Sequence, residues 1–176
     1  GGWSCPRLID MDFDGDLDLV VGNEAGILFY YQNNGTPASP LWQVVNGFFG
    51  AIDIGSNCVP TFGDLDADGD LDMVTGNLFG EVQCFIRQRQ IWEENNVLFS
   101  GIETDQNATP ALVDLDHDGD LDLVLGDYDG TFKFYRNLLY SGAVLNSPLN
   151  PSLEINNEVM VLWDSPSAGS TSPFEH

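Results

Sequence analysis

Short apolar runs alternate with glycine-containing turns along most of this chain. The apolar runs 19–21, 73–75 and 123–125 are each closed by a Gly and a four-residue turn that ends in Gly, which is typical of a β-hairpin. The returning strand then alternates between apolar and other residues, and the apolar positions of one face are predicted to lie in the core. These positions are Leu28 and Tyr30, Val82 and Cys84, and Phe132 and Phe134.

Two further aromatic segments predict an outer strand for each of the first two units. They run from Trp42 to Phe49 and from Trp92 to Phe99, and 52–55 and 102–105 then lead into the next unit. Four short strands in roughly fifty residues are typical of a β-propeller blade. The predicted fold class is therefore all-β, with propeller-type blades that form an incomplete ring, followed by a linker and extra β-strands.

An acidic nine-residue motif, Asp-x-Asp-x-Asp-Gly-Asp-Leu-Asp, occurs in each unit. It occupies residues 10–18, 64–72 and 114–122, at spacings of 54 and 50 residues. A Pro stands four residues before the first Asp of every copy. Repetition in this register indicates one structural unit used three times, over about 5–54, 55–104 and 105–140.

The acidic motif predicts a calcium site in each unit. Side chains at positions 1, 3, 5 and 9 of a tight loop converge as hard oxygen ligands, the Gly at position 6 permits the sharp turn, and position 7 contributes a backbone oxygen. The predicted side-chain ligands are Asp10, Asp12, Asp14 and Asp18; Asp64, Asp66, Asp68 and Asp72; and Asp114, Asp116, Asp118 and Asp122. The predicted backbone ligands are Asp16, Asp70 and Asp120.

Two other interpretations of these loops are a solvated acidic turn and an EF-hand. Asp and Gly are common turn residues, so the loops could be solvated acidic turns, but three copies in register favour a metal site. An EF-hand needs a bidentate Glu at position 12 between two helices. Position 12 here is Val21, Thr75 or Leu125, inside a strand pattern, which excludes that motif.

The net charge of the chain limits the classes of partner that it is expected to bind. Lys and Arg number 5 against 28 Asp and Glu, a formal net charge of −23. Such a field repels phosphate backbones and anionic lipid headgroups, so neither nucleic-acid binding nor membrane insertion is expected. Because 43% of the residues are hydrophobic, a disordered acidic tail is excluded as well.

The runs 15–23 and 113–126 resemble the FG-GAP and VCBS repeats, the calcium-binding blades of integrin α-subunit propellers and of many secreted microbial proteins. The resemblance covers roughly residues 5 to 137. It implies calcium, Ca²⁺, in the loop between the first two strands of each blade, an extracellular or cell-surface location, and a role in adhesion or surface assembly. Three blades are too few to close a ring, since propellers have about four to eight.

The C-terminal stretch differs from the repeats. Residues 141–151 are predicted to form a linker. Within 152–176, the segments 152–155 and 158–166 are similar to the first two strands of a fibronectin type III sandwich, and the Ser-, Gly- and Pro-rich end from Ser165 is predicted to be a mobile tail. We expect a partial β-sandwich or donated strands here. The expected partners are other copies of the chain or further domains of a longer one, together with protein or glycan surface ligands.

The remaining candidate residues are three cysteines and two asparagines. Cys5 and Cys58 precede the first strand of adjacent units, and their pairing is left undecided, whereas Cys84 is predicted to be a buried free thiol. Two Asn-x-Thr triplets make Asn34 and Asn107 candidate glycosylation sites. No arrangement of nucleophile and base has a recognisable spacing.

The sequence therefore predicts a calcium-binding, extracellular structural or adhesive module that is not an enzyme. A filament subunit assembled by strand exchange, and an accessory non-catalytic region of a large secreted enzyme, are the alternatives.

Overall fold

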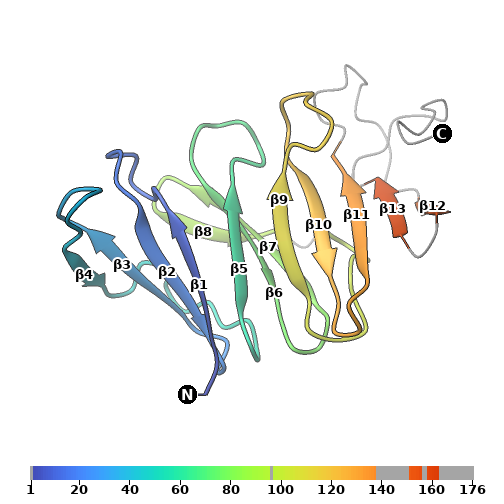
Figure 1. The fold of residues 1–176 in the computed structure, drawn as a ribbon, viewed down its shortest axis with the longest axis horizontal. Coiled ribbons are helices and arrows are strands. Elements are labelled where there is room, and N and C mark those ends of the chain that lie inside the picture. Colours follow the sequence, from blue (N-terminus) through green and yellow to red (C-terminus); the bar gives the residue numbers. More distant parts are fainter. Residues whose placement is uncertain (1, 96, 138–150, 156–157, 163–176) are drawn as a thin grey trace.

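Three β-sheets stand side by side in a computed structural model that describes residues 2–95, 97–137, 151–155 and 158–162 (Figure 1). The strands of the first two sheets are β1 Ser4–Ile9, β2 Asp18–Asn23, β3 Leu28–Asn33, β4 Trp42–Val45, β5 Val59–Gly63, β6 Asp72–Gly76, β7 Val82–Gln88 and β8 Ile91–Glu94. Those of the third are β9 Thr109–Val113, β10 Asp122–Gly126, β11 Phe132–Arg136, β12 Pro151–Ile155 and β13 Glu158–Leu162.

The first two sheets are four-stranded antiparallel meanders in which each strand pairs with the next in sequence. Their orders are β1-β2-β3-β4 and β5-β6-β7-β8. The three sheets do not close on one another (Figure 1), and the described residues contain no helix. The predicted all-β fold of propeller-type blades in an open ring is confirmed.

The third sheet is completed differently. β9, β10 and β11 form the same meander, but the next position is filled by β13, which runs parallel to β11, with β12 outside it. The predicted linker 141–151 lies almost entirely outside the described residues, and the predicted mobile tail 165–176 lies wholly outside them. The resemblance of 152–176 to a fibronectin sandwich stays a prediction.

The predicted outer strands are too long. The structure has strands at 42–45 and 91–94, and the chain then turns. Phe49 and Phe99 lie in these turns with 5% and 4% of their surface exposed. An aromatic side chain can be buried from a turn as well as from a strand, so apolar periodicity alone does not separate the two.

The hydrophobic core lies between adjacent sheets. One cluster joins the first sheet to the second, around Val20, Met73 and Phe85, and another joins the second to the third, around Val74, Leu123 and Tyr135. The prediction that Phe132 and Phe134 belong to the core is wrong, since Phe132 is 39% exposed and Phe134 is partly exposed. Within the described residues no further sheet covers this face.

Each pair of neighbouring sheets is joined by the same backbone contacts, which we call the joint. At the first joint the N–H groups of Cys58, Asn57 and Ile54 donate to the carbonyls of Asn23, Glu24 and Gly26 at 3.0 to 3.1 Å. At the second joint Ala108, Asn107 and Thr104 donate to Asn77, Leu78 and Gly80 at 2.9 to 3.0 Å. Repeated hydrogen bonds at equivalent positions fix how one blade sits on the next.

Candidate metal-binding loops

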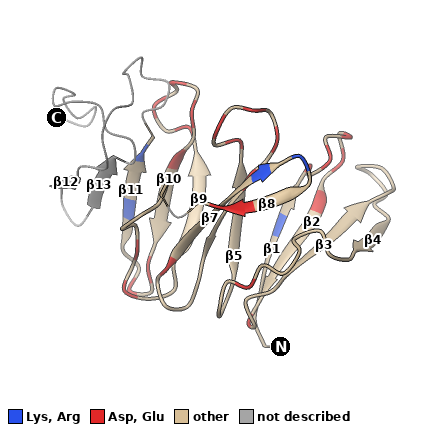
Figure 2. Cartoon of the chain, turned by 180° about the vertical axis from the view of Figure 1, so that it is seen from behind, with Lys and Arg blue, Asp and Glu red and all other residues tan. Residues whose placement is uncertain are grey.

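The three acidic loops lie at one edge of the molecule. Each connects the first two strands of its sheet, and all three project at the top of Figure 1. Acidic residues colour the same loops in the view from behind (Figure 2). The joints lie at the opposite ends of these strands, so the charged loops and the blade contacts are separated.

The backbone of each loop follows one pattern. The Gly at position 6 has a positive φ in every copy, at 94° for Gly15, 92° for Gly69 and 100° for Gly119. Position 4 is also left-handed, with φ of 59° to 63°, although Phe13, Ala67 and His117 are not glycines. Non-glycine residues adopt this conformation rarely, so three in register show that the loop imposes it.

Carboxylate oxygens gather inside each loop. In the first and third loops the acids at positions 1, 3 and 5 bring ligand atoms within 4.8 Å of one another, and in the second loop positions 1, 3 and 9 do so. These groups are Asp10, Asp12 and Asp14; Asp64, Asp66 and Asp72; and Asp114, Asp116 and Asp118. Three predicted side-chain ligands, Asp18, Asp68 and Asp122, lie outside these groups, as do the acids at position 7.

Loop amides hold several of the clustered carboxylates. The N–H of position 6 donates to the position-1 carboxylate at 3.0 Å for Gly15 to Asp10 and 3.1 Å for Gly69 to Asp64. In all three loops the position-7 N–H donates to the position-5 carboxylate at 2.9 to 3.2 Å. These short-range hydrogen bonds shape the loop without an ion.

Position 9 has a role that sequence reasoning missed. Asp18, Asp72 and Asp122 are almost fully buried. One oxygen of each accepts the N–H of loop position 2, and the other accepts an N–H from the end of the third strand of the same sheet, at Asn33, Arg87 or Asn137. This carboxylate therefore ties the loop to its blade.

Burial and crowding of like charges alter the acidity of the loops. Burial, opposed by hydrogen bonds from the Arg87 and Leu65 amides, raises the pKa of Asp72 from 3.8 to about 6. Burial, followed by neighbouring carboxylates, also raises the pKa of Asp16 and Asp70. The pKa values of Asp66 and Asp122 are raised as well, again chiefly by burial.

Some buried carboxylate oxygens have no hydrogen-bond donor among the described residues. They include one oxygen each of Asp64 and Asp118, and both residues belong to the clusters described above. A buried carboxylate oxygen without a donor costs free energy unless a cation pairs with it. The donor set of clustered carboxylates fits a hard divalent cation.

The loops differ in what faces their position-3 carboxylate. In the first loop the Gln32 amide donates to Asp12 at 2.6 Å. In the third loop Arg136, at the equivalent place on β11, forms an ion pair with Asp116. The equivalent residue of the second blade is Ile86, so that position of the second blade carries neither an amide nor a guanidinium side chain.

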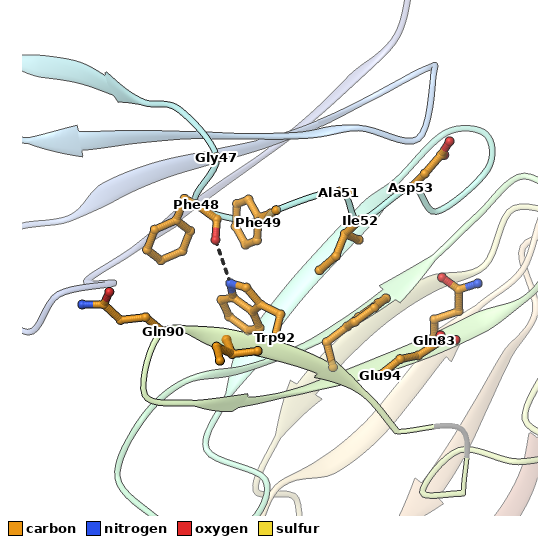
Figure 3. A pocket seen from close by; sticks show the side chains of 13 residues that line it. Gly47, Phe48, Phe49, Ala51, Ile52, Asp53, Gln83, Gln90, Trp92 and Glu94 are labelled. Atoms are coloured by element: carbon orange, nitrogen blue, oxygen red, sulfur yellow. Dashed lines mark hydrogen bonds between the residues drawn. The ribbon is translucent and has the colours of Figure 1, made fainter.

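A pocket of about 510 Å³ lies between the first two sheets (Figure 3). Asp53, Gln83, Gln90 and Glu94 line it together with aromatic side chains. Trp92 donates its indole N–H to the Phe48 carbonyl at 3.2 Å (Figure 3). Its ring also packs against Phe49 and the Arg87 guanidinium, so Trp92 supports the contact between the sheets.

The two candidate glycosylation residues occupy different surroundings. Asn34 is exposed between β3 and β4, whereas Asn107 is partly buried at the second joint, where its N–H donates to the Leu78 carbonyl. His117 is exposed at position 4 of the third loop. No helix among the described residues is long and apolar enough to span a membrane.

Comparison with known proteins finds one matching family. The model of the FG-GAP-like repeat matches residues 10–75 and again residues 64–125. The two matches together span more than half of the chain and include all three acidic loops. No curated protein matches the sequence.

Proposed function

The chain belongs to the FG-GAP-like repeat family, and on this premise we propose that it is an extracellular structural or adhesive module whose β-propeller-type blades are rigidified by Ca²⁺. The observation that carries the proposal is the threefold clustering of carboxylate oxygens at one edge of the fold. Oxygen-rich cages of this kind suit calcium better than the softer transition metals.

Electrostatics explains why the loops need a cation. Two carboxylates about 4 Å apart repel by about 4 kcal/mol at an effective dielectric of 20, and each loop holds five acids. A divalent ion bound among these carboxylates would attract each of them and so offset their mutual repulsion. The proposed ligands are the side chains at positions 1, 3, 5 and 9, with a backbone oxygen from position 7.

Calcium would act on the blade through the loop backbone. The position-9 carboxylate already joins loop position 2 to the end of the third strand, as Asp72 does for Leu65 and Arg87. An ion bound by the loop would hold the position-9 carboxylate in place and, through it, loop position 2 and the end of the third strand. Extracellular modules bind calcium with Kd of about 0.1 to 1 mM, so the proposed sites would fill outside cells.

The charge of the molecule supports protein or glycan partners over nucleic acid or membrane surfaces, because the net charge is −23. The pocket between the first two sheets offers carboxylates and amides beside aromatic rings, which is one concave place for such a ligand. We assign no catalytic role, and an accessory region of a secreted enzyme stays an alternative.

A filament subunit is a second candidate function. It is favoured by β13, which fills the fourth position of the third sheet in parallel with β11 and from more than twenty residues further along the chain. A strand that no tight turn holds to its neighbour can be donated to another copy. Sedimentation in calcium and after chelation would distinguish calcium-dependent polymers, expected for this candidate, from single chains, which would argue against it.

Thermal unfolding tests the calcium proposal. We expect the melting temperature to rise with CaCl₂ relative to a chelator, because calcium tenfold above its Kd adds about 1.4 kcal/mol of stability per site. Magnesium is the control and should stabilise less, since it demands a tighter octahedral shell. Equal melting temperatures in calcium and in chelator would contradict the proposal.

A further inference from the structure

We propose that Cys5 and Cys58 form a disulfide bond that links the first blade to the second. The two residues lie on β1 and just before β5, on either side of the first joint. The bond would cross-link a contact that is otherwise held by backbone hydrogen bonds and apolar packing. It does not depend on calcium binding, so the two proposals can fail separately.

The strand register directs Cys5 toward Cys58. Cys5 lies directly opposite Gly22 in the antiparallel pair of β1 and β2, and residues directly opposite each other point to the same face of a sheet. A Cβ built on Gly22 would meet the Cys58 carbonyl oxygen at 2.2 Å and the Cys58 Sγ at 3.1 Å. The face that Cys5 shares with Gly22 is therefore the face that contacts Cys58.

A second contact on the same face confirms this orientation. Arg7 is two residues after Cys5 and thus points to the same side of β1. Its Nε donates to the carbonyl of Pro60 at 2.8 Å, and Pro60 is two residues after Cys58. The two strands therefore run past each other with Cys5 beside Cys58 and Arg7 beside Pro60.

The third cysteine does not compete for this pairing. Cys84 is buried in the cluster between the second and third sheets, whereas Cys58 belongs to the cluster between the first and second. Burial and the neighbouring Cys5 raise the pKa of the Cys58 thiol to about 12. The pKa of the buried Cys84 thiol is raised chiefly by burial and then by the nearby carboxylates of Asp72 and Asp66, not by another thiol.

The second joint supplies an internal comparison. Val59 and Ala108 occupy the positions that correspond to Cys5 and Cys58. Val59 lies opposite Gly76, and a Cβ on Gly76 would meet the Ala108 Cβ at 2.8 Å. The geometry repeats with apolar side chains, so the first joint is the one whose residues can be oxidised together.

Oxidation requires a small disulfide from the surroundings, such as oxidised glutathione. The Cys5 thiolate attacks that disulfide, forms a mixed disulfide and releases one glutathione thiol. The Cys58 thiolate then attacks the Cys5 sulfur, forms the Cys5–Cys58 bond and releases the second glutathione thiol. Two electrons and two protons pass from the protein to the oxidant. Because Cys58 is fully buried in the folded chain, the second step is fastest while the joint is still open.

Peptide mapping of the full chain tests the bond. The chain is refolded with oxidised and reduced glutathione, alkylated, and cleaved after Arg by trypsin and after Glu by glutamyl endopeptidase. Fragments 1–7, 25–81 and 82–87 then carry one cysteine each. We expect 1–7 linked to 25–81 in a single chain, and 82–87 alkylated. Fragment 1–7 recovered alkylated, linked to 82–87, or linked between two chains would overturn the proposal.

Two variants control the result. Cys5→Ala should abolish the linked peptide and remove the difference in melting temperature between oxidised and reduced protein, which we expect to be several degrees in favour of the oxidised form. The pair Val59→Cys with Ala108→Cys should create a corresponding link at the second joint. Equal melting temperatures of oxidised and reduced wild-type chain would contradict a bond that holds the blades together.

Discussion

At each acidic loop, the aspartate at position 9 is held in a different way from the acid at position 3. Asp72 is fully buried, and its two oxygens accept backbone N–H groups of Leu65 and Arg87. Asp66 is exposed and accepts one N–H, that of Asp68 at 3.2 Å. We therefore expect position 9 to matter for folding with or without metal, and position 3 to matter when metal is bound.

Asp72→Ala and Asp66→Ala should separate these roles in metal-free buffer. Asp72→Ala leaves two buried N–H groups without an acceptor and should lower the free energy of unfolding by about 2 to 5 kcal/mol. Asp66→Ala removes a like charge from the cluster and should change it by less than about 1 kcal/mol, in the stabilising direction. Urea unfolding measures both, and equal losses would contradict the assignment.

Arg136 should weaken calcium binding at the third loop. Its guanidinium pairs with Asp116 and so competes with an incoming cation for that carboxylate. Arg136→Gln gives the third loop the amide that the first loop has in Gln32. We expect calcium to bind the third site of this variant about tenfold more tightly, equivalent to roughly 1.4 kcal/mol.

Calorimetric titration of the Arg136→Gln variant against wild type measures this affinity. Lys133→Gln is the control: it removes a cation from the same strand, but Lys133 donates to the Glu103 carbonyl and not to a loop carboxylate, so calcium binding at the third loop should stay unchanged. An unaltered third site in Arg136→Gln would show that the ion pair does not restrain calcium.

Much of the loop could be predicted from the sequence, and some of it could not. The spacing of acids and the Gly at position 6 indicate the convergence of carboxylates that the structure shows. The double hydrogen bonding of position 9 could not be predicted, because its partners Asn33, Arg87 and Asn137 are 15 residues away on a separate strand. The Arg136 ion pair depends on the same long-range register.

At the scale of elements, the joint depends on a glycine that allows the backbones to approach closely. A Cβ on Gly76 would lie 2.1 Å from the Ala108 carbonyl oxygen and 2.6 Å from its carbon. The equivalent Gly126 of the third sheet would place its Cβ 2.5 Å from the Thr109 hydroxyl, which is a side-chain atom that can rotate away. Neither glycine has a positive φ.

Gly76→Ala should therefore destabilise the fold more than Gly126→Ala. The backbone of Ala108 cannot move without breaking the joint, so we expect a loss of about 1 to 3 kcal/mol from overpacking. Gly126→Ala should lie within about 1 kcal/mol of wild type, since a new methyl group also restricts the unfolded chain. Chemical denaturation compares the two, and equal stability would argue that the joint is not tightly packed.

The strand order of a blade could be predicted, but the ends of its elements could not. Alternation and Gly turns indicate the first three strands of each sheet, because these signals are local. The turns that bury Phe49 and Phe99 read as strand from the sequence, since their apolar side chains fill the space between sheets. Phe132 is exposed for the converse reason, because no described sheet follows the third.

The protonation of the buried aspartates makes the free energy of unfolding of the molecule depend on pH. Burial raises the pKa of Asp72 to about 6 in the folded chain, against 3.8 ordinarily, and the pKa values of Asp16, Asp70 and Asp122 move in the same direction. Between these values the folded chain holds a proton that the unfolded chain has released. Acidification through this range therefore favours the folded state when no metal is bound.

We expect the melting temperature of the metal-free chain to rise as pH falls from 7 to about 5, with a gain of about 1 kcal/mol from the protonation of Asp72. The calcium-loaded chain should show the opposite trend, because protons compete with the ion for the same carboxylates. Melting curves of dialysed protein at both pH values measure this, and parallel trends in the two forms would contradict it.

Three calcium ions would change the formal net charge from −23 to −17, since each contributes two positive charges. A calorimetric titration of calcium into the metal-free chain counts the bound ions and so tests whether the three loops are calcium sites. We predict three ions per chain for the wild type and two for each of Asp12→Ala, Asp66→Ala and Asp116→Ala. If calcium addition gives no binding heat, or if these substitutions leave the number of bound ions unchanged, the three loops are not the proposed calcium sites.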